Sequence, residues 1–524
     1  MQFQKVGKNM SLNMYLGETQ IQRQSMNHMC IEIIQGMEKA IQSIDRFRGT
    51  MLLRGQSYDS AKNFMAQTHR PLAQGIIYLC EELIRQNDRY PEAFQSEVAA
   101  TDVVEQEVLG QIQQIDNLIR QTEALEETLP LARSMTGILY NMKRGLEDKL
   151  NRLHTFNASS SSNYETALEL AQNVATGIAE LQNGNGFNSA SGTFSTKGMN
   201  MDWAGRIDDI HYTRKAEEHY GEYLRNNPDD LEKVMEVLKY EDQHPDHAQK
   251  TDNFLDPLET QDILGIKYLM YTAEEPYRTL TLEYLDRFEI TSTTDSGVFY
   301  PSDNAITFNV ENDRVNDRGA YFTFFHELGH AIDYYSGADQ GMDGYYTNSF
   351  TIDGQNLSDR MYDDVENRIR TDLEAELNQE AYQHLNEEDK VNMVNNIADE
   401  FIYRGPSDFA LTSEEEELYE TIRVQLSDEL RTDAHHNASD IYGGATVNEI
   451  IGKWGHHNAS YWIDDNGERV REPNMEGFAS YYGSIMIEEG EFRDEQLESV
   501  DVYLPESREF MDEILESMNE GVNE

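Results

Sequence analysis

Cysteine is almost absent from this sequence, with only Cys30 and Cys80 among 524 residues. Each lies in an apolar pattern of helical spacing, so we interpret both as buried free thiols rather than as disulfide partners. No cysteine follows residue 80. A metal site in the later part of the chain must therefore draw its ligands from His, Asp and Glu.

Long hydrophobic runs are also missing. No apolar stretch approaches the roughly 18 residues that a membrane-spanning helix needs, and the mean hydropathy is −0.69. The first five residues, Met-Gln-Phe-Gln-Lys, lack the apolar core of a secretory signal peptide. We therefore expect a soluble protein without a stable membrane span and without a route through the general secretion pathway.

Positive charge is scarce, since 42 Lys and Arg stand against 97 Asp and Glu and give a net charge of −55. Residues 1–200 hold 18 basic and 22 acidic residues, so their net charge is −4 and residues 201–524 carry the other −51. This difference, in a chain of this length, indicates two different domains. The acidic part disfavours non-specific binding of nucleic acid, because carboxylates repel phosphate, and it favours solubility or basic partners.

The first 180 residues contain apolar positions at steps of three and four, which predict long amphipathic helices packed on one another. We expect these stripes to form a core and to leave apolar seams for partner helices. One stripe consists of Met26, Met29, Ile33, Met37, Ile41, Ile44 and Phe47. Residues 183–198 are rich in Gly, Asn, Ser and Thr and predict a flexible linker. The predicted domains are therefore 1–182 and 206–524, joined by a linker at 183–205.

A ten-residue segment of the N-terminal part carries a signature. It consists of Leu53-Arg54-Gly55-Gln56-Ser57-Tyr58-Asp59-Ser60-Ala61-Lys62. With helical sequence on both sides of it, the segment resembles the signature of LXG domains. The resemblance covers residues 1–200 and implies the N-terminal export module of a polymorphic toxin from a Gram-positive bacterium. It also implies small helical proteins and the type VII secretion machinery as partners, and a cognate immunity protein for the C-terminal domain.

The acidic part combines helical patterns with one strand candidate. Helical spacing is found near 214–240, near 258–288 and from about 360 to 435. Residues 305–310 alternate between apolar and polar in the manner of a strand. We therefore predict an α+β C-terminal domain that follows a mainly α bundle or rod of long helices.

The strongest chemical signal is the run His-Glu-Leu-Gly-His at 326–330. On a helix, His-Glu-x-x-His places two imidazoles on one face with the spacing of a zinc-binding pair. At about 100° per residue, His326, His330 and Asp333 share one face, and apolar residues occupy the other. Gly329 in mid-helix costs roughly 1 kcal/mol relative to Ala, so we expect a close backbone neighbour or room for substrate there.

Zinc catalysis needs three protein ligands and one open position for water. We interpret His326 and His330 as two of the ligands, and Glu327 as the general base that acts on the water. Asp333 shares the helix with both histidines, so we expect it to orient one of them rather than to bind the metal.

The third ligand is left open by the motif itself. Residues 333 and 336 are Asp and Ser, not the Gly and His of the metzincin pattern, which excludes that class. A downstream carboxylate is the natural candidate. Glu476 lies at the start of a predicted helix, whereas Glu374 and Glu376 lie in an acidic helix and are rivals.

A second resemblance bears on this choice. The helix around His326 is similar to the active helix of lethal-factor-like zinc peptidases, and later segments are similar to the C-terminal part of related peptidase-like domains of toxins and phage proteins. These segments are 326–334, 439–444, 454–457, 461–462 and 476–479. The resemblance implies Glu476 as the third zinc ligand. It also implies Tyr461 or His457 as the hydrogen-bond donor to the transition state.

Together these observations predict a secreted toxin whose acidic C-terminal domain has a zincin-like fold and is a zinc-dependent metalloendopeptidase of the gluzincin kind, acting on a protein substrate. One alternative is a housekeeping peptidase without toxic function. The other is a non-catalytic interaction protein with a structural zinc ion. In that case His457 or Asp333 would close the fourth coordination position.

Overall fold

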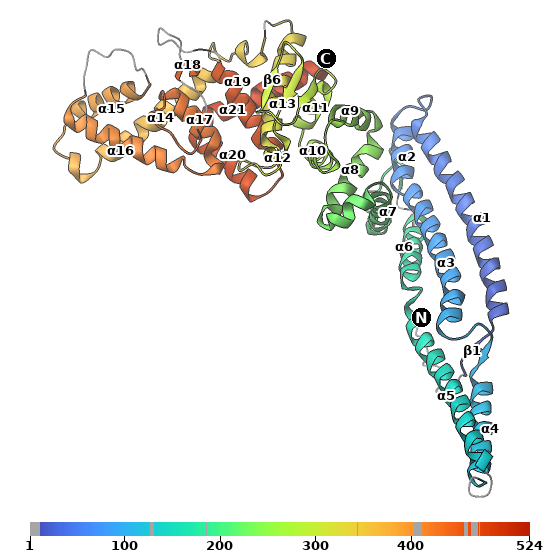
Figure 1. Ribbon diagram of the computed structural model, residues 1–524. Coiled ribbons are helices and arrows are strands. Elements are labelled where there is room, and N and C mark those ends of the chain that lie inside the picture. The colour runs from blue at the N-terminus through green and yellow to red at the C-terminus, as the bar shows by residue number, and fades with distance from the viewer. Residues whose placement is uncertain are drawn as a thin grey trace. The chain divides into compact units, whose positions relative to one another are not determined.

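Helices dominate the computed structural model, as the spacing of apolar residues predicts (Figure 1). The structure describes residues 11–125, 130–184, 186–342, 344–402, 411–454, 459–462, 470 and 472–523. It divides into two compact units, Met1–Arg214 and Lys215–Glu524. Among the described residues no helix is both long enough and apolar enough to cross a membrane.

The N-terminal unit is built from long helices that pack in antiparallel pairs. In the first pair, α1 (Leu16–Gly49) lies against α3 (His69–Glu97), with α2 (Gln56–Gln67) between them in the chain. In the second pair, α4 (Glu105–Glu123) lies against α5 (Pro130–Ser159). A short antiparallel pairing of β1 (Asn13–Met14) with β2 (Val103–Val104) ties the start of the chain to the start of α4.

Two hydrophobic clusters hold this unit together. One includes Met14, Leu16, Phe94, Val103, Leu153 and Phe156, and the other includes Ile77, Tyr78, Leu170, Trp203, Ala204 and Ile207. The stripe predicted on α1 is only partly core: Ile44 is buried, but Met26, Met29 and Ile33 are exposed. The reason is that α3 covers one side of α1 and leaves part of the apolar stripe open.

The segment predicted as a flexible linker has a defined structure. After α6 (Glu165–Gln182) the chain forms an antiparallel hairpin of β3 (Phe187–Asn188) and β4 (Thr193–Phe194). The ring of Phe194 packs against Phe64 of α2 at 5.6 Å, and the Phe194 N–H donates to Ser60 Oγ at 3.1 Å.

The division between the units falls after Arg214, later than the predicted linker at 183–205. It lies inside α7 (Asp202–Asn226), and Trp203 at the start of this helix is buried in the N-terminal core. Composition predicts a linker at 183–205 because Gly, Asn and Ser are frequent in that segment. Its aromatic side chains nevertheless attach it to the N-terminal unit.

The C-terminal unit surrounds one small sheet with helices. The strand order is β5 (Glu289–Ser292), β7 (Ala305–Thr307), β6 (Val298–Tyr300), with β5 parallel and β6 antiparallel to β7. The strand predicted at 305–310 ends at Thr307, because Asn309 caps α12 (Val310–Asp313) through its side chain. The helices before the sheet are α8 (Leu231–Gln243), α9 (Pro245–Leu255), α10 (Thr260–Thr272) and α11 (Tyr277–Tyr284).

The remaining helices follow the sheet. They are α13 (Phe322–Asp339), α14 (Leu357–Leu377), α15 (Glu387–Ile402), α16 (Ser413–Glu429), α17 (His436–Ala445), α18 (Ala459–Trp462), α19 (Glu472–Met486), α20 (Glu491–Tyr503) and α21 (Pro505–Asn523). The predicted helical stretch at 360–435 thus corresponds to α14, α15 and α16. Short 3-10 turns lie at η3 (Tyr346–Asn348) and η5 (Asp433–His435).

The start of α13 is fixed by a buried carboxylate. Asp313 accepts hydrogen bonds from the backbone N–H groups of Thr323 and Phe324, at 2.9 and 2.8 Å. These N–H groups have no partner within the helix, and the negative charge also suits the positive end of the helix dipole. The helix that carries both histidines is thereby set in place at its first turn.

Helix α13 then packs closely on α19. A Cβ atom at Gly329 would lie 3.0 Å from the Cα of Ala479 and 3.2 Å from the Cβ of Tyr482. A Cβ at Gly483 of α19 would in turn meet the ring of Phe322 at 3.1 Å. Of the two reasons expected for Gly329, the close backbone neighbour is therefore the one that the structure shows.

Gly329→Ala should lower the free energy of unfolding by about 1–3 kcal/mol, because the added methyl group meets backbone that cannot give way. Urea denaturation followed by tryptophan fluorescence measures this change. Gly443→Ala on α17 is the matched control, since its Cβ would lie 3.6 Å from Asn448 Oδ1, an ordinary contact. Wild-type stability of Gly329→Ala would contradict the close packing of α13 on α19.

Candidate functional site

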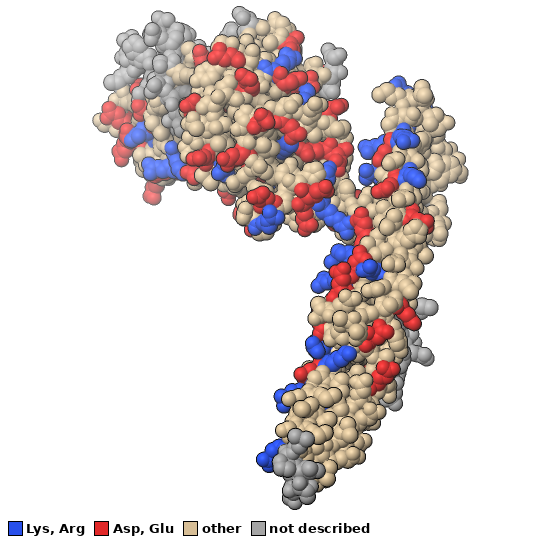
Figure 2. Space-filling view, turned by 45° about the vertical axis from the view of Figure 1, so that its right-hand side comes forward, with Lys and Arg blue, Asp and Glu red and all other residues tan. Residues whose placement is uncertain are grey.

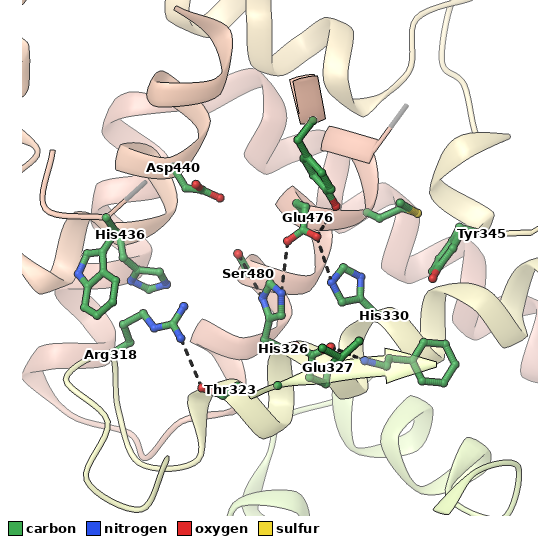
Figure 3. Close-up of a pocket in the computed structure, with 16 residues that line it drawn as sticks. Arg318, Thr323, His326, Glu327, His330, Tyr345, His436, Asp440, Glu476 and Ser480 are labelled. Carbon is green, nitrogen blue, oxygen red and sulfur yellow. Dashed lines mark hydrogen bonds and ion pairs between the residues drawn. The ribbon is translucent and has the colours of Figure 1, made fainter. Parts of the chain in front are cut away.

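A cavity of about 480 Å³ opens in the C-terminal unit where α13, α17, α19 and β6 come together. Figure 3 shows His326 and His330 of α13 in the middle of it, with Glu476 of α19 facing both rings. Arg318 and His436 lie on one side of this centre, and Tyr345 lies on the other. Side chains from distant parts of the sequence therefore converge on the predicted motif.

The two histidines and Glu476 form a compact cluster. His326 Nε2 lies 3.4 Å from Glu476 Oε2, and His330 Nε2 lies 3.5 Å from Glu476 Oε1. The two imidazole rings stand at 90° with centroids 4.8 Å apart. The side chains are only 11–15% exposed. Three potential ligand atoms thus point at one small volume that opens to the cavity.

The spacing of these atoms suits a single tetrahedral cation. Ligand atoms at 2.0–2.1 Å from a tetrahedral zinc ion lie about 3.3 Å from one another. The two nitrogen–oxygen distances are close to this value, and one ligand atom from each of the three residues lies within 4.8 Å of the others. Within the described part of the chain, His326, His330 and Glu476 are the group of side chains that could hold a metal ion. The rivals Glu374 and Glu376 lie on α14 and are not part of this group.

Ser480 supports the cluster one helical turn after Glu476. Its Oγ lies 3.3 Å from His326 Nδ1. If Nδ1 carries the ring proton and donates it to Ser480, Nε2 keeps a free lone pair that points at the cluster. A hydrogen bond on the second ring nitrogen is the usual way in which proteins orient an imidazole ligand.

Glu327 lies beside the cluster and is held by the sheet. Its Oε2 accepts a hydrogen bond from the backbone N–H of Phe299 in β6, at 2.8 Å. Burial raises the pKa of Glu327 to about 7, although the neighbouring His326 acts in the opposite direction. A Cβ at Gly297 would lie 3.0 Å from Glu327 Oε1, so glycine leaves room for this oxygen. The carboxylate is thus fixed on one oxygen and open on the other.

Tyr461 binds Glu476 directly. Its hydroxyl donates to Glu476 Oε1 at 2.6 Å, and burial followed by the charge of Glu476 raises the pKa of this phenol. The second residue that the resemblance implied as a donor, His457, lies outside the described residues. Tyr461 is therefore placed at the cluster, with its proton directed to the carboxylate.

Asp333 is fully buried and anchors the turn that follows α13. Its two oxygens accept from Thr347, one from the backbone N–H at 2.8 Å and one from the hydroxyl at 2.6 Å. Burial raises the pKa of Asp333 to about 7, and the bonds from Thr347 oppose that shift. We expected Asp333 to orient a histidine; the contacts that the structure shows hold η3 instead.

The anchored turn brings Tyr345 to the cavity, which the sequence did not indicate. The Tyr345 ring lies 6.4 Å from the His330 ring and 5.5 Å from the Tyr334 ring. Burial, followed by the charge of Asp333, raises the pKa of Tyr345 to about 12. A tyrosine in a loop with no motif around it carries no signal in a single sequence, so only the fold could locate it.

Comparison with known proteins identifies the N-terminal part. Residues 18–193 match the LXG domain of the WXG superfamily. A protein of Bacillus cereus named Toxin is 56% identical over 203 residues, which are 38% of this chain and 37% of that relative. The match thus spans little more than a third of the relative's length. No solved structure matches the chain.

Asp333→Ala should lower the free energy of unfolding by about 1–3 kcal/mol, because it leaves two buried donors of Thr347 without an acceptor. Thr347→Val should have a smaller effect, since the backbone bond remains. Asp295→Ala, at an exposed position, serves as the control and should change stability by less than about 0.5 kcal/mol. Thermal or urea unfolding of the three variants ranks them; an Asp333→Ala variant as stable as the control would contradict the anchoring role.

Proposed function

From the LXG domain and the toxin relative, we propose that this chain is a secreted polymorphic toxin whose C-terminal unit is a zinc-dependent metallopeptidase. The observation that carries the enzymatic part is the cluster of His326, His330 and Glu476, whose potential ligand atoms lie within 4.8 Å of one another, with Glu327 held beside it. The LXG domain supports secretion and contacts with secretion machinery. Type VII export, small helical partners and an immunity protein are part of the proposal.

In the proposed peptide hydrolysis, different residues of the cavity bind the metal ion and transfer the proton. One zinc ion at His326, His330 and Glu476 supplies Lewis-acid chemistry when it is bound. Glu327 accepts a proton from the attacking water and passes it to the leaving amine. Because the Phe299 N–H occupies Oε2 of this carboxylate, Oε1 is the oxygen that takes the proton.

The two tyrosines have different parts in this proposal. The Tyr461 hydroxyl donates its hydrogen bond to Glu476 and so orients the carboxylate of this proposed ligand. Tyr345, across the cavity, is the donor to the oxyanion that develops on the substrate carbonyl. The sequence resemblance implied that role for Tyr461 or His457, and the observed bond from Tyr461 to Glu476 favours Tyr345.

An extended peptide fits the cavity because a strand borders it. In the described sheet β6 pairs with β7 on one side, and Val298 and Phe299 of β6 line the cavity. A peptide can add to a strand edge through backbone hydrogen bonds, which recognise any sequence. Because the Phe299 N–H already donates to Glu327, the peptide would bond to the other backbone groups of this segment. This supports a protein substrate rather than a small metabolite.

Zinc binding tests the metal site. The wild-type chain should bind one zinc ion, and Glu476→Ala should weaken binding at least about 100-fold, because it removes one of three ligands. Titration with a chromophoric chelator as competitor measures both affinities. Glu374→Ala, at the rival carboxylate on α14, is the matched control and should bind as the wild type does. Unchanged affinity in Glu476→Ala would remove the basis for the site.

Cleavage tests the catalytic base. Glu327→Gln should keep one bound zinc ion and lose about 10²–10⁴-fold in rate, since general base catalysis contributes this much. New protein N-termini in treated cell extracts, quantified by mass spectrometry, report the cleavage. Glu311→Gln, exposed at the start of α12, should cleave as the wild type does. Full cleavage and toxicity of Glu327→Gln would refute the enzymatic proposal.

A further inference from the structure

Arg318 brings a fixed positive charge into an acidic cavity. Among the described residues that line the cavity it is the one Lys or Arg, whereas Glu327, Asp440 and Glu476 are carboxylates. The surrounding sequence is strongly acidic, and Figure 2 shows Asp and Glu spread over the visible face of the C-terminal unit. A cation in this position therefore needs a local explanation.

The side chain of Arg318 is held by rings rather than by a carboxylate. Its guanidinium lies 4.2 Å from the ring centroid of Phe322 and 5.1 Å from that of Trp454. Among the described residues, its one side-chain hydrogen bond is a long one, from Nη2 to Thr323 Oγ1 at 3.4 Å. Stacking between aromatic faces fixes the plane of a guanidinium and leaves its N–H groups free to bind an anion.

The backbone around Arg318 is also fixed. Its N–H donates to Asn316 Oδ1 at 2.9 Å, and its carbonyl accepts from Gln496 Nε2 at 2.8 Å. The next residue, Gly319, has a φ of +115°, which favours glycine. Hydrogen bonds thus fix the backbone of Arg318 at both its N–H and its carbonyl group. A ligand site needs such preorganisation to recognise its ligand.

Arg314, four residues earlier, shows what a structural arginine looks like in the same loop. It binds Asp262 with two hydrogen bonds, at 2.9 and 2.8 Å. Arg318 has no such partner: in the described part of the chain no carboxylate forms an ion pair with it, and its buried Nε has no hydrogen-bond partner. The fold thus supplies Arg314 with a carboxylate partner for its charge, whereas among the described residues it supplies none for Arg318.

An incompletely paired charge on a half-buried side chain is unfavourable. Burial lowers the pKa of Arg318, while Asp313, Asp440 and Glu327 act against that shift from a distance. Because a guanidinium stays protonated in proteins, the cost remains as desolvation that an incoming anion would offset. Figure 3 shows the guanidinium on the side of His326 and Ser480, away from Tyr345, so such an anion would lie beside the reacting centre.

We propose that Arg318 forms a carboxylate-binding subsite, so that the peptides accepted by this cavity carry a carboxylate close to the bond that is cleaved. This inference rests on the peptidase function proposed above. A planar carboxylate matches the guanidinium fork with two parallel hydrogen bonds. A phosphate dianion also pairs with the arginine fork, but its second negative charge meets stronger repulsion from Asp440, Glu327 and Glu476. The carboxylate can be an Asp or Glu side chain or the end of a peptide chain.

Peptide capture tests the subsite without catalysis. The full chain with Glu327→Gln, loaded with zinc, is immobilised and offered two random hexapeptide pools, one with free C-terminal carboxylates and one with C-terminal amides. Mass spectrometry of the retained peptides should show enrichment of about fivefold or more for carboxylates over their amide counterparts, as expected for a charge-assisted pair. Asp and Glu enriched in the amide pool identify a side-chain ligand, and enrichment in the acid pool alone identifies the chain end.

The arginine variants decide the assignment. Arg318→Gln should abolish the enrichment, and Arg318→Lys, which keeps the charge but loses the fork, should reduce it. Arg423→Gln, at a surface arginine that pairs with Glu420 on α16, is the matched control and should retain it. Circular dichroism shows whether Arg318→Gln folds. If it does not, the enrichment by Arg318→Lys is compared with that by the Arg423→Gln control, and a lower enrichment by Arg318→Lys supports the subsite. Equal enrichment in Arg318→Lys, Arg318→Gln and the control would overturn the subsite.

The same pools separate this inference from the function on which it rests. Cleavage by the wild type without any preference for a carboxylate overturns the subsite and leaves the peptidase standing. Enrichment that depends on Arg318, with no cleavage by the wild type, overturns the peptidase and leaves a carboxylate-binding cavity. The two proposals therefore fail in different ways.

Discussion

The close contact of α13 with α19 is the constraint on which the rest of the site depends. Glycine at 329 lets the backbone of Ala479 approach, and this approach sets both imidazoles of α13 against Glu476. As the zinc site proposed above, this cluster would tolerate little error, since a shift of about an ångström would separate atoms that have to share one ion. The packing of the two helices thus sets the geometry of the cluster, and the small residues of the interface are as necessary to it as the polar ones.

Part of this arrangement could be predicted from the sequence, and the reasons are physical. The spacing of His326 and His330 is local, so a helix is enough to place them on one face. Glu476 lies far along the chain, and a resemblance, rather than any pattern of spacing, singled it out; the structure brings the three side chains together. Long helices in the N-terminal unit also follow from local periodicity.

The features that escaped prediction depend on tertiary contacts. Arg318 matters because Phe322 and Trp454 enclose it, and these residues are far apart in sequence. Tyr345 reaches the cavity through a turn that Asp333 anchors by way of Thr347. The sequence predicts a linker where β3 and β4 form a hairpin, because composition reports flexibility on average, whereas the Phe194 ring packs on one specific partner, Phe64.

The donor set of the cluster has a consequence for the surroundings in which it can persist. Two imidazoles and a carboxylate contain no sulfur, and both cysteines of the chain, Cys30 and Cys80, belong to the N-terminal unit. Thiolate ligands are lost to oxidants and to disulfide exchange, but nitrogen and oxygen donors are not. If the chain is a secreted zinc peptidase, as proposed above, a centre with these donors would withstand an oxidising exterior and could be loaded with zinc outside the cell.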